Sequence, residues 1–186
     1  FYRLKKSYID AGASGSLGYT EANAGSQTGV SIEIQTSSPS VKFNFATNSK
    51  YADRWGKLEP FRNGSYVTWQ KSPVGETTTS ISGVVSSVGP ATWTVYLPTF
   101  KNQILTSIEL EDGYNLEPLA ASNKPIYVAI GNSITHGTGQ TGTRETYPWK
   151  VADALGYELY NFAVGGSRFN KEILDNFEGM TPDLIT

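Results

Sequence analysis

The sequence predicts two parts of different fold class: an antiparallel, jelly-roll-like β-sandwich over residues 1–120 and the first half of an α/β domain with a parallel sheet over residues 121–186. Through the first two-thirds of the chain, short runs of alternating apolar and polar residues are separated by Gly and Pro, which is typical of antiparallel strands. Later, a continuous apolar run and two amphipathic segments follow in the order β-α-β-α-β. That order is typical of a parallel, doubly wound sheet.

In the first part, two runs alternate most clearly, residues 30–34 and residues 41–45, and the turn signal Ser-Ser-Pro-Ser at 37–40 separates them. We expect them to form a hairpin. Further strands are predicted around residues 67–69, 93–97 and 108–110, with Trp93 in the core. No segment of this part shows a convincing helical pattern.

In the second part, residues 125–130 are continuously apolar, which predicts a strand covered on both faces. A helix is expected from about 148 to 155, with Thr146 near its N-cap and Gly156 at its end. A second strand is predicted over 157–164. A second helix should follow, capped by Asn170 and ended by Gly179, before a third strand begins at Asp183.

Composition limits the classes of function. The chain has 186 residues, 38% hydrophobic and 17% charged, so it can bury a core. A net charge of −2 gives no general polycation for nucleic acid or an anionic membrane, and no apolar run is long enough to span a bilayer. The chain has no Cys and one His, which excludes disulfides, thiolate metal sites and any site that needs two imidazoles from this chain.

Two predicted strand ends carry residues suited to acyl transfer, and sites in open parallel sheets form at the carboxyl ends of strands. After the first strand, Gly131 permits a sharp turn and Ser133 places a hydroxyl just beyond it. After the second strand, Gly165 and Gly166 can present a bare N–H to an oxyanion. Of these two glycines, we favour Gly166 as the donor and Gly165 as permissive backbone.

At these residues the chain resembles the SGNH (GDSL-type) hydrolase superfamily. Residues 130–135, Ile-Gly-Asn-Ser-Ile-Thr, are similar to its first block, usually Gly-Asp-Ser-Ile-Thr, and residues 161–166 are similar to its second block. Residues 181–185 resemble the strand that leads into the third block. The β-rich start is similar to the N-terminal sandwich of two-domain bacterial members, which include carbohydrate-deacetylating esterases. The resemblance implies that residues 121–186 begin a three-layer SGNH-hydrolase domain.

The resemblance also implies roles for individual residues. Ser133 would be the acyl-accepting nucleophile, and its N–H and that of Gly166 would hold the oxyanion. The family adds an Asn from its third block and an Asp and a His from a late block, at positions that this chain does not contain. We therefore expect an N-terminal fragment that is nearly inactive alone, completed by a C-terminal segment of the same gene product or by a second chain. Acyl transfer through serine implies no metal and no cofactor.

One residue of the first block departs from the family pattern, because Asn132 stands where the family usually has Asp. That Asp is not the acid of the triad, so the nucleophile is not lost with it. An amide cannot supply the same charge, so we expect local hydrogen bonding or the pH dependence of activity to differ.

Several other polar or aromatic residues have a structural explanation beside a functional one. His136 is expected at a loop or pocket rim rather than as the base, and Arg144 and Glu145 are expected to form a solvated pair. Trp55 is interpreted as an exposed aromatic residue, with stacking on a sugar ring as the less favoured alternative. Three carboxylates are interpreted as solvated rather than as a glycosidase pair: Glu109, Glu111 and Asp112.

The preferred function is a serine esterase that removes an acyl group, most plausibly acetyl, from a carbohydrate, so the expected partners are an acylated carbohydrate or small ester and the complementing segment. The alternatives are a non-catalytic carbohydrate-binding protein with a degenerate hydrolase domain and a structural module. No hydrophobic leader is visible in residues 1–6, so a signal peptide is either absent or already removed. We expect a secreted or periplasmic protein.

Overall fold

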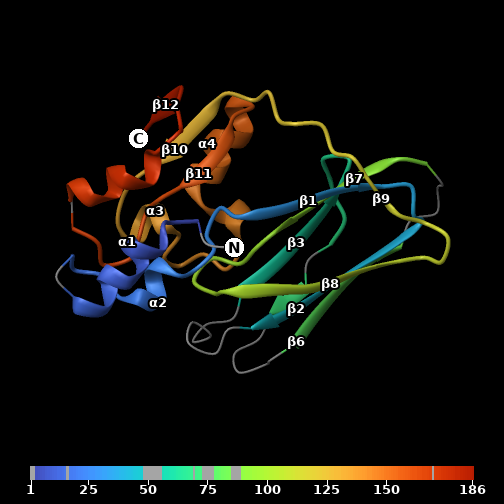
Figure 1. Ribbon diagram of the computed structural model, residues 1–186, viewed down its shortest axis with the longest axis horizontal. Helices are drawn as coiled ribbons and strands as arrows, with labels where there is room; N and C mark the ends of the chain where they lie inside the picture. Colours follow the sequence, from blue (N-terminus) through green and yellow to red (C-terminus); the bar gives the residue numbers. More distant parts are fainter. Residues whose placement is uncertain are drawn as a thin grey trace.

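The computed structural model describes residues 3–15, 17–47, 56–68, 70–72, 78–84, 89–168 and 170–186. Two antiparallel sheets lie on one side of the molecule, and a small parallel sheet with its helices lies on the other (Figure 1). Trp55, Trp69 and Phe169 fall outside the described residues, so the expectation for Trp55 stays a prediction. Within the described residues no helix is long and apolar enough to cross a membrane.

The larger antiparallel sheet has the strand order β4-β3-β7-β1-β9, with β5 paired to β3, and the smaller has the order β6-β2-β8. The strands are β1 (Ser31–Thr36), β2 (Ser40–Thr47), β3 (Gly56–Arg62), β4 (Ser65–Tyr66), β5 (Gln70–Ser72), β6 (Thr78–Val84), β7 (Ala91–Tyr96), β8 (Gln103–Leu110) and β9 (Leu116–Glu117). Val67 lies outside these strands and is 40% exposed, so the strand predicted around residues 67–69 is wrong at that residue.

Alternate side chains of the two antiparallel sheets meet in one hydrophobic cluster. Trp93 is 1% exposed, which confirms its predicted place in the core. The buried members of the cluster come from β1, β2, β3, β6 and β7 and from the residue after β7: Ile34, Val41, Phe43, Phe45, Leu58, Ile81, Ala91, Trp93, Val95 and Leu97. The period-2 pattern of residues 30–34, 41–45 and 93–97 therefore identified the inward face of β1, β2 and β7, whereas β3 and β6 were not predicted.

The predicted hairpin between residues 30–34 and 41–45 is wrong, although both segments are strands. β1 pairs with β7 and β9, whereas β2 pairs with β6 and β8 in the other sheet. The connecting turn is held by Ser38, whose Oγ donates to Ser40 O at 2.6 Å and accepts from Glu111 N at 3.0 Å. The turn carries the chain from one sheet to the facing sheet, so both apolar faces meet in the same core without pairing.

The N-terminal segment is helical, contrary to expectation. It contains α1 (Lys6–Ala11), the 3₁₀ helix η1 (Gly12–Ser14) and α2 (Glu21–Ala24), and the Thr20 side chain caps α2 by accepting from Asn23 N at 3.2 Å. These elements pack on the parallel-sheet part in a second buried cluster of Leu4, Tyr8, Ile9, Tyr19, Ala24, Val128, Phe162, Val164 and Ile173. The boundaries 1–120 and 121–186 stay a prediction, but the packing of residues 4–24 joins them to the later part.

The small parallel sheet has the predicted order of elements. β10 (Ile126–Ala129) lies between β11 (Glu158–Asn161) and β12 (Leu184–Ile185) and pairs in parallel with both. Helix α4 (Tyr147–Leu155) is capped by the Thr146 side chain, which accepts from Trp149 N, and ends at Gly156 with φ 71°. The second predicted helix is a 3₁₀ helix, η4 (Lys171–Phe177), capped by Asn170. Antiparallel sheets followed by a small parallel sheet are thus confirmed.

The loop that follows β10 contains α3 (Ser133–His136) and η3 (Thr143–Glu145), and it docks on β3. Lys57 N donates to Thr141 O at 2.8 Å, and the Lys57 ammonium pairs with the Glu145 carboxylate. The guanidinium of Arg144 lies 4.7 Å from the ring centre of Phe61. The expected solvated Arg144–Glu145 pair is therefore wrong, because each side chain binds the antiparallel part of the molecule instead.

Candidate active site

The two segments singled out in the sequence meet at the carboxyl end of the parallel sheet. α3 begins soon after β10, and residues 162–168 continue from β11. Val164 N donates to Gly131 O at 3.1 Å, and Asn161 Nδ2 donates to Thr135 O at 2.9 Å. The first bond joins the two backbones directly and the second joins the Asn161 side chain to the backbone of α3, so the spatial proximity expected from the parallel order is present.

Ser133 is the first residue of α3 and is half-buried. A Cβ at position 131 would lie 2.2 Å from Thr135 Oγ1, so the turn before Ser133 has room only for glycine. The Asn132 side chain caps α3, because its Oδ1 accepts from Ile134 N at 3.3 Å. A neutral amide thus supplies the capping oxygen at this position.

Gly166 is exposed and has φ 90°, a backbone conformation that favours glycine. A Cβ there would also lie 2.8 Å from Gly18 O. Among the described residues, neither the N–H of Gly166 nor that of Ser133 donates a hydrogen bond within the chain. Both N–H groups are therefore unengaged among the described residues, and their role as oxyanion donors stays a prediction.

His136 is completely buried, which corrects its expected place at a pocket rim. Its Nδ1 accepts from Gly165 N at 2.8 Å, and this acceptor role places the hydrogen of the neutral ring on Nε2. Nε2 lies 2.6 Å from Ser26 Oγ and donates to it, while the ring lies 4.0 Å from that of Phe100. Because both ring nitrogens are engaged, His136 holds the glycine loop and does not serve Ser133 as a base.

The N-terminal segment completes this network and was not predicted to be near the site. Asn23 Nδ2 donates to Gly165 O at 2.8 Å, and Ser26 Oγ donates to Asn23 O at 2.8 Å. The Gly165 peptide is thus held at its N–H by His136 and at its carbonyl by Asn23. Nothing in the local pattern of residues 23–26 signals this role, because the contact spans more than 140 positions of sequence.

A cavity of about 160 Å³ opens beside the two segments. Asn132 and Ser167 line it, and they are the chain neighbours of Ser133 and Gly166. The remaining lining residues are Ile130, Gly131, Arg168, Asn170 and Ile173. The cavity therefore adjoins the two segments, although Ser133 and Gly166 are not among its lining residues.

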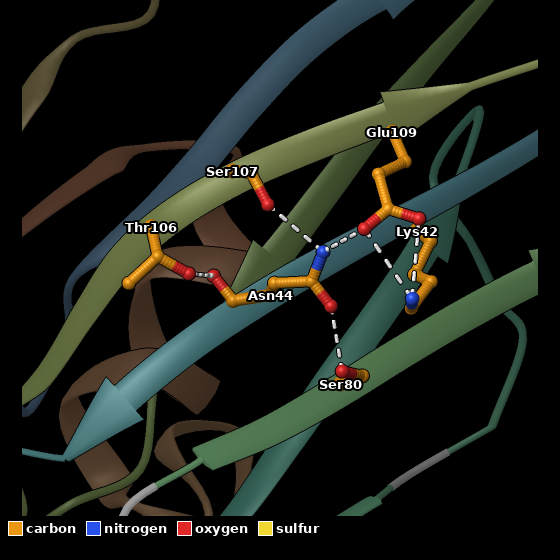
Figure 2. Close-up of polar contacts among 6 residues, drawn as sticks. All are labelled: Lys42, Asn44, Ser80, Thr106, Ser107 and Glu109. Carbon is orange, nitrogen blue, oxygen red and sulfur yellow. Dashed lines mark hydrogen bonds and ion pairs between the residues drawn. The ribbon is translucent and has the colours of Figure 1, made fainter.

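The three carboxylates considered as a glycosidase pair are exposed, as predicted. Figure 2 shows Glu109 in a surface network across β2, β6 and β8, where it pairs with Lys42 at 3.1 Å and contacts Asn44. The hydrogen bond from Lys42 lowers the pKa of Glu109. Because the carboxylate is ionised and solvated, it is not suited to act as a general acid.

No protein-family model and no curated protein sequence matches the chain. Solved structures do. The salicylyl-acyltransferase SsfX3 from a tetracycline biosynthetic pathway superposes with a TM-score of 0.82 at 21% identity, over 99% of this chain and 54% of that protein. A GDSL-like lipase from Bacteroides ovatus superposes with a TM-score of 0.70 at 19% identity, over 100% of this chain and 57% of that protein. The chain has the SGNH (GDSL-type) hydrolase fold.

A third structure has the same fold. An active-site mutant of a family two carbohydrate esterase from Clostridium thermocellum superposes with a TM-score of 0.64 at 11% identity, over 86% of this chain and 58% of that protein. The chain therefore spans little more than half the length of these SGNH-fold proteins.

Proposed function

We propose that the chain supplies the nucleophile and part of the oxyanion site of an SGNH-type serine esterase. The observation that carries this proposal is local. Ser133 stands at the turn after the central parallel strand, and the loop hydrogen-bonded to that turn presents Gly166 with an unengaged N–H. A hydroxyl and two free backbone donors at one sheet edge suit attack on an ester carbonyl.

The chemistry follows from these roles. Ser133 Oγ attacks the carbonyl carbon of the ester and loses its proton to a base, and the carbonyl oxygen becomes an oxyanion held by the two N–H groups. The bond to the alcohol then breaks as the alcohol takes up the proton, which leaves an acyl-serine. Water repeats the attack, releases the acid and restores Ser133. In this proposal the base is a His oriented by an Asp, both supplied by a segment outside these 186 residues or by a second chain.

The proposed substrate is an acetylated carbohydrate. The small size of the cavity supports a short acyl group, and one of the proteins with the same fold is a carbohydrate esterase. Such a substrate agrees with a secreted or periplasmic location, which we propose on that ground.

A second candidate is a carbohydrate-binding protein without catalysis. The engagement of both ring nitrogens of His136 favours it, because His136 is the one His in the sequence. Under this alternative the antiparallel sheets would bind glycan and the α/β part would be degenerate.

The test uses the full-length protein with a serine-directed phosphonate and mass spectrometry. We expect the label on Ser133 and a loss of p-nitrophenyl acetate turnover on the order of 10⁴-fold or more in Ser133→Ala. Ser167→Ala is the matched control, because Ser167 lines the same cavity and should be dispensable. A label on Ser167, or normal turnover by Ser133→Ala, would reject the proposal, whereas glycan binding without any turnover would select the second candidate.

A further inference from the structure

A second and larger groove, of about 820 Å³, lies between the antiparallel sheet and the parallel-sheet part. Its lining includes residues of β1, β3 and β7 on one wall and residues of α4 and β11 on the other. Figure 1 shows these two groups of elements on opposite sides of the molecule's middle. The groove shares no lining residue with the 160 Å³ cavity beside the Ser133 and Gly166 segments, so the two are separate.

One wall is the face of the antiparallel sheet that points away from the core. In the register of β1 and β7, Ser31 lies opposite Tyr96 and Glu33 lies opposite Thr94. Phe61 of β3 lies opposite Thr94 from the other side. On β1 and β7 these residues alternate with core residues such as Ile34 and Val95, so their side chains share the outer face. Phe61 is itself buried and lies on the same side of β3, opposite to Leu58 of the core. Hydroxyls, a carboxylate and aromatic rings therefore lie side by side on this wall.

The facing wall carries an aromatic ring and a carboxylate on one side of α4. Trp149 and Asp153 both line the groove, four positions apart and so one helical turn apart. The Trp149 and Tyr96 rings, one from each wall, are in edge-to-face contact with centres 5.7 Å apart, so the two walls touch at this end of the groove. The Arg144 guanidinium lies 5.2 Å from the Trp149 ring centre and supports that ring. The aromatic surface is thus fixed in place before any ligand arrives.

The polar groups of the groove suit a neutral, polyhydroxylated ligand. Glu33 and Asp153 place negative charge in it, and Lys124 and Arg3 place positive charge, so neither a polyanion nor a polycation is favoured. Sugar hydroxyls donate and accept, and sugar rings present an apolar face to aromatic side chains.

A peptide strand fits this groove less well. β11 is an edge strand of the described parallel sheet, but it has four residues, and the outward carbonyl of Asn161 already accepts from Arg3 Nη1 at 2.9 Å. Little unpaired backbone is left for an added strand, and strand addition depends on such groups.

We propose that the groove between β1-β7-β3 and α4-β11 binds a neutral oligosaccharide. This site is distinct from the Ser133 site and does not depend on esterase activity. In an esterase it would retain the polysaccharide while the ester centre acts on it, and in a protein without catalysis it would be the binding function itself.

The experiment measures binding by calorimetry to full-length Ser133→Ala protein, so that no ligand turns over. The probes are cellohexaose, xylohexaose and mannohexaose. We expect at least one to bind, and we expect the double variant Glu33→Gln/Asp153→Asn to raise Kd about tenfold, because each loses a charge-assisted hydrogen bond to ligand hydroxyls. Glu109→Gln is the matched control: Glu109 is exposed on β8, outside the groove, and its variant should bind within about twofold of the parent.

Several results would overturn the proposal. One is the absence of binding by all three hexasaccharides at millimolar concentration, and another is an equal Kd for the double variant and the control. Binding abolished by phosphonylation of Ser133 in the otherwise unaltered protein, but not by the double variant, would place the sugar in the small cavity instead. Thermal unfolding of each variant checks that its fold is intact. Since phosphonate labelling of Ser133 is scored separately, either proposal can fail while the other holds.

Discussion

His136 shows how one side chain can be close to a candidate nucleophile in sequence and still take no part in the chemistry. It lies three positions after Ser133, a spacing that leaves its role open in the sequence. In the fold, the same α3 turn points the ring into the interior, where it accepts from Gly165 N and donates to Ser26 Oγ. The ring thus fixes the peptide that precedes the proposed oxyanion donor.

Truncating this ring should destabilise the protein. His136→Ala leaves the Gly165 N–H without its partner, removes one hydrogen-bond partner of the Ser26 hydroxyl and opens a cavity against Phe100. We expect a loss of about 2–4 kcal/mol in the free energy of unfolding, measured by urea denaturation. Ser26→Ala, which removes one hydrogen-bonding hydroxyl from the same network, should lose about 1 kcal/mol. Equal free energies of unfolding for His136→Ala and wild type would show that this hydrogen-bond network does not stabilise the protein.

At the scale of elements, the loop of residues 137–146 ties the two parts of the molecule together. Glu145 pairs with Lys57 of β3, and its Oε2 accepts from Thr141 N at 2.9 Å and from Gly142 N at 3.2 Å. Desolvation by itself raises the pKa of Glu145, but the hydrogen bonds from Lys57, Thr141 and Gly142 outweigh it and lower that pKa to about 2. The ionised carboxylate is therefore part of the docked loop.

This shift predicts how stability depends on pH. A carboxyl whose pKa falls from 4.5 to about 2 on folding contributes stability above pH 4.5, and that contribution is lost as pH drops towards 2. At pH 7, Glu145→Gln should cost about 1 kcal/mol after allowance for partial exposure, or roughly 2–4 °C in Tm. The Tm difference from wild type should shrink between pH 4.5 and 2.

Both proteins keep Glu59, whose pKa is raised mainly by burial and further by the charge of Glu145, so the Tm difference also includes this smaller coupling. Glu59 contributes in the opposite direction, since its stabilisation is present at low pH and is lost as pH rises. Glu111→Gln, at an exposed position just after β8, is the control and should leave Tm unchanged at each pH. A Tm difference for Glu145→Gln that stays constant from pH 7 to pH 2 would contradict the ion pair.

The elements that the sequence predicted correctly are those specified by local signals. Thr146 and Gly156 bound α4 by capping chemistry, and the apolar run that forms β10 is recognisable without its neighbours. The exchange of β1 and β2 between sheets was missed, because the same alternation serves a hairpin and two facing strands equally well. The short helices before residue 25 were missed because their stability comes from packing on the parallel sheet rather than from their own pattern.

The residues of the candidate site also fall into those that local sequence signals predict and those that only long-range packing determines. Ser133 and the glycines stand at strand ends and could be placed by counting elements from the sequence. The support from Asn23 and Ser26, and the stacking of Arg144 on Phe61, join segments far apart in the chain. Such contacts are decided by the packing of the whole chain, for which a single sequence carries no signal.

At the scale of the whole molecule, the proposed chemistry needs a base that these 186 residues do not offer. The sequence contains one His, and both of its ring nitrogens are engaged away from Ser133. Within the described part of the chain, no group of three or more His, Cys, Asp and Glu side chains gathers where it could hold a metal ion that activates a nucleophile. The esterase proposal therefore assigns the base to residues outside this chain's own set.

Residues 1–186 expressed alone should therefore be nearly inactive. We expect p-nitrophenyl acetate turnover lower by about 10⁴-fold or more than that of the protein that carries the complementing His and Asp, since a serine without its base retains little beyond oxyanion stabilisation. The groove does not depend on that segment in the same way, because both of its described walls lie within these residues. Ester turnover by residues 1–186 at the rate of the complete protein would mean that Ser133 finds its base within them, and the assignment of His136 to a structural role would then be wrong.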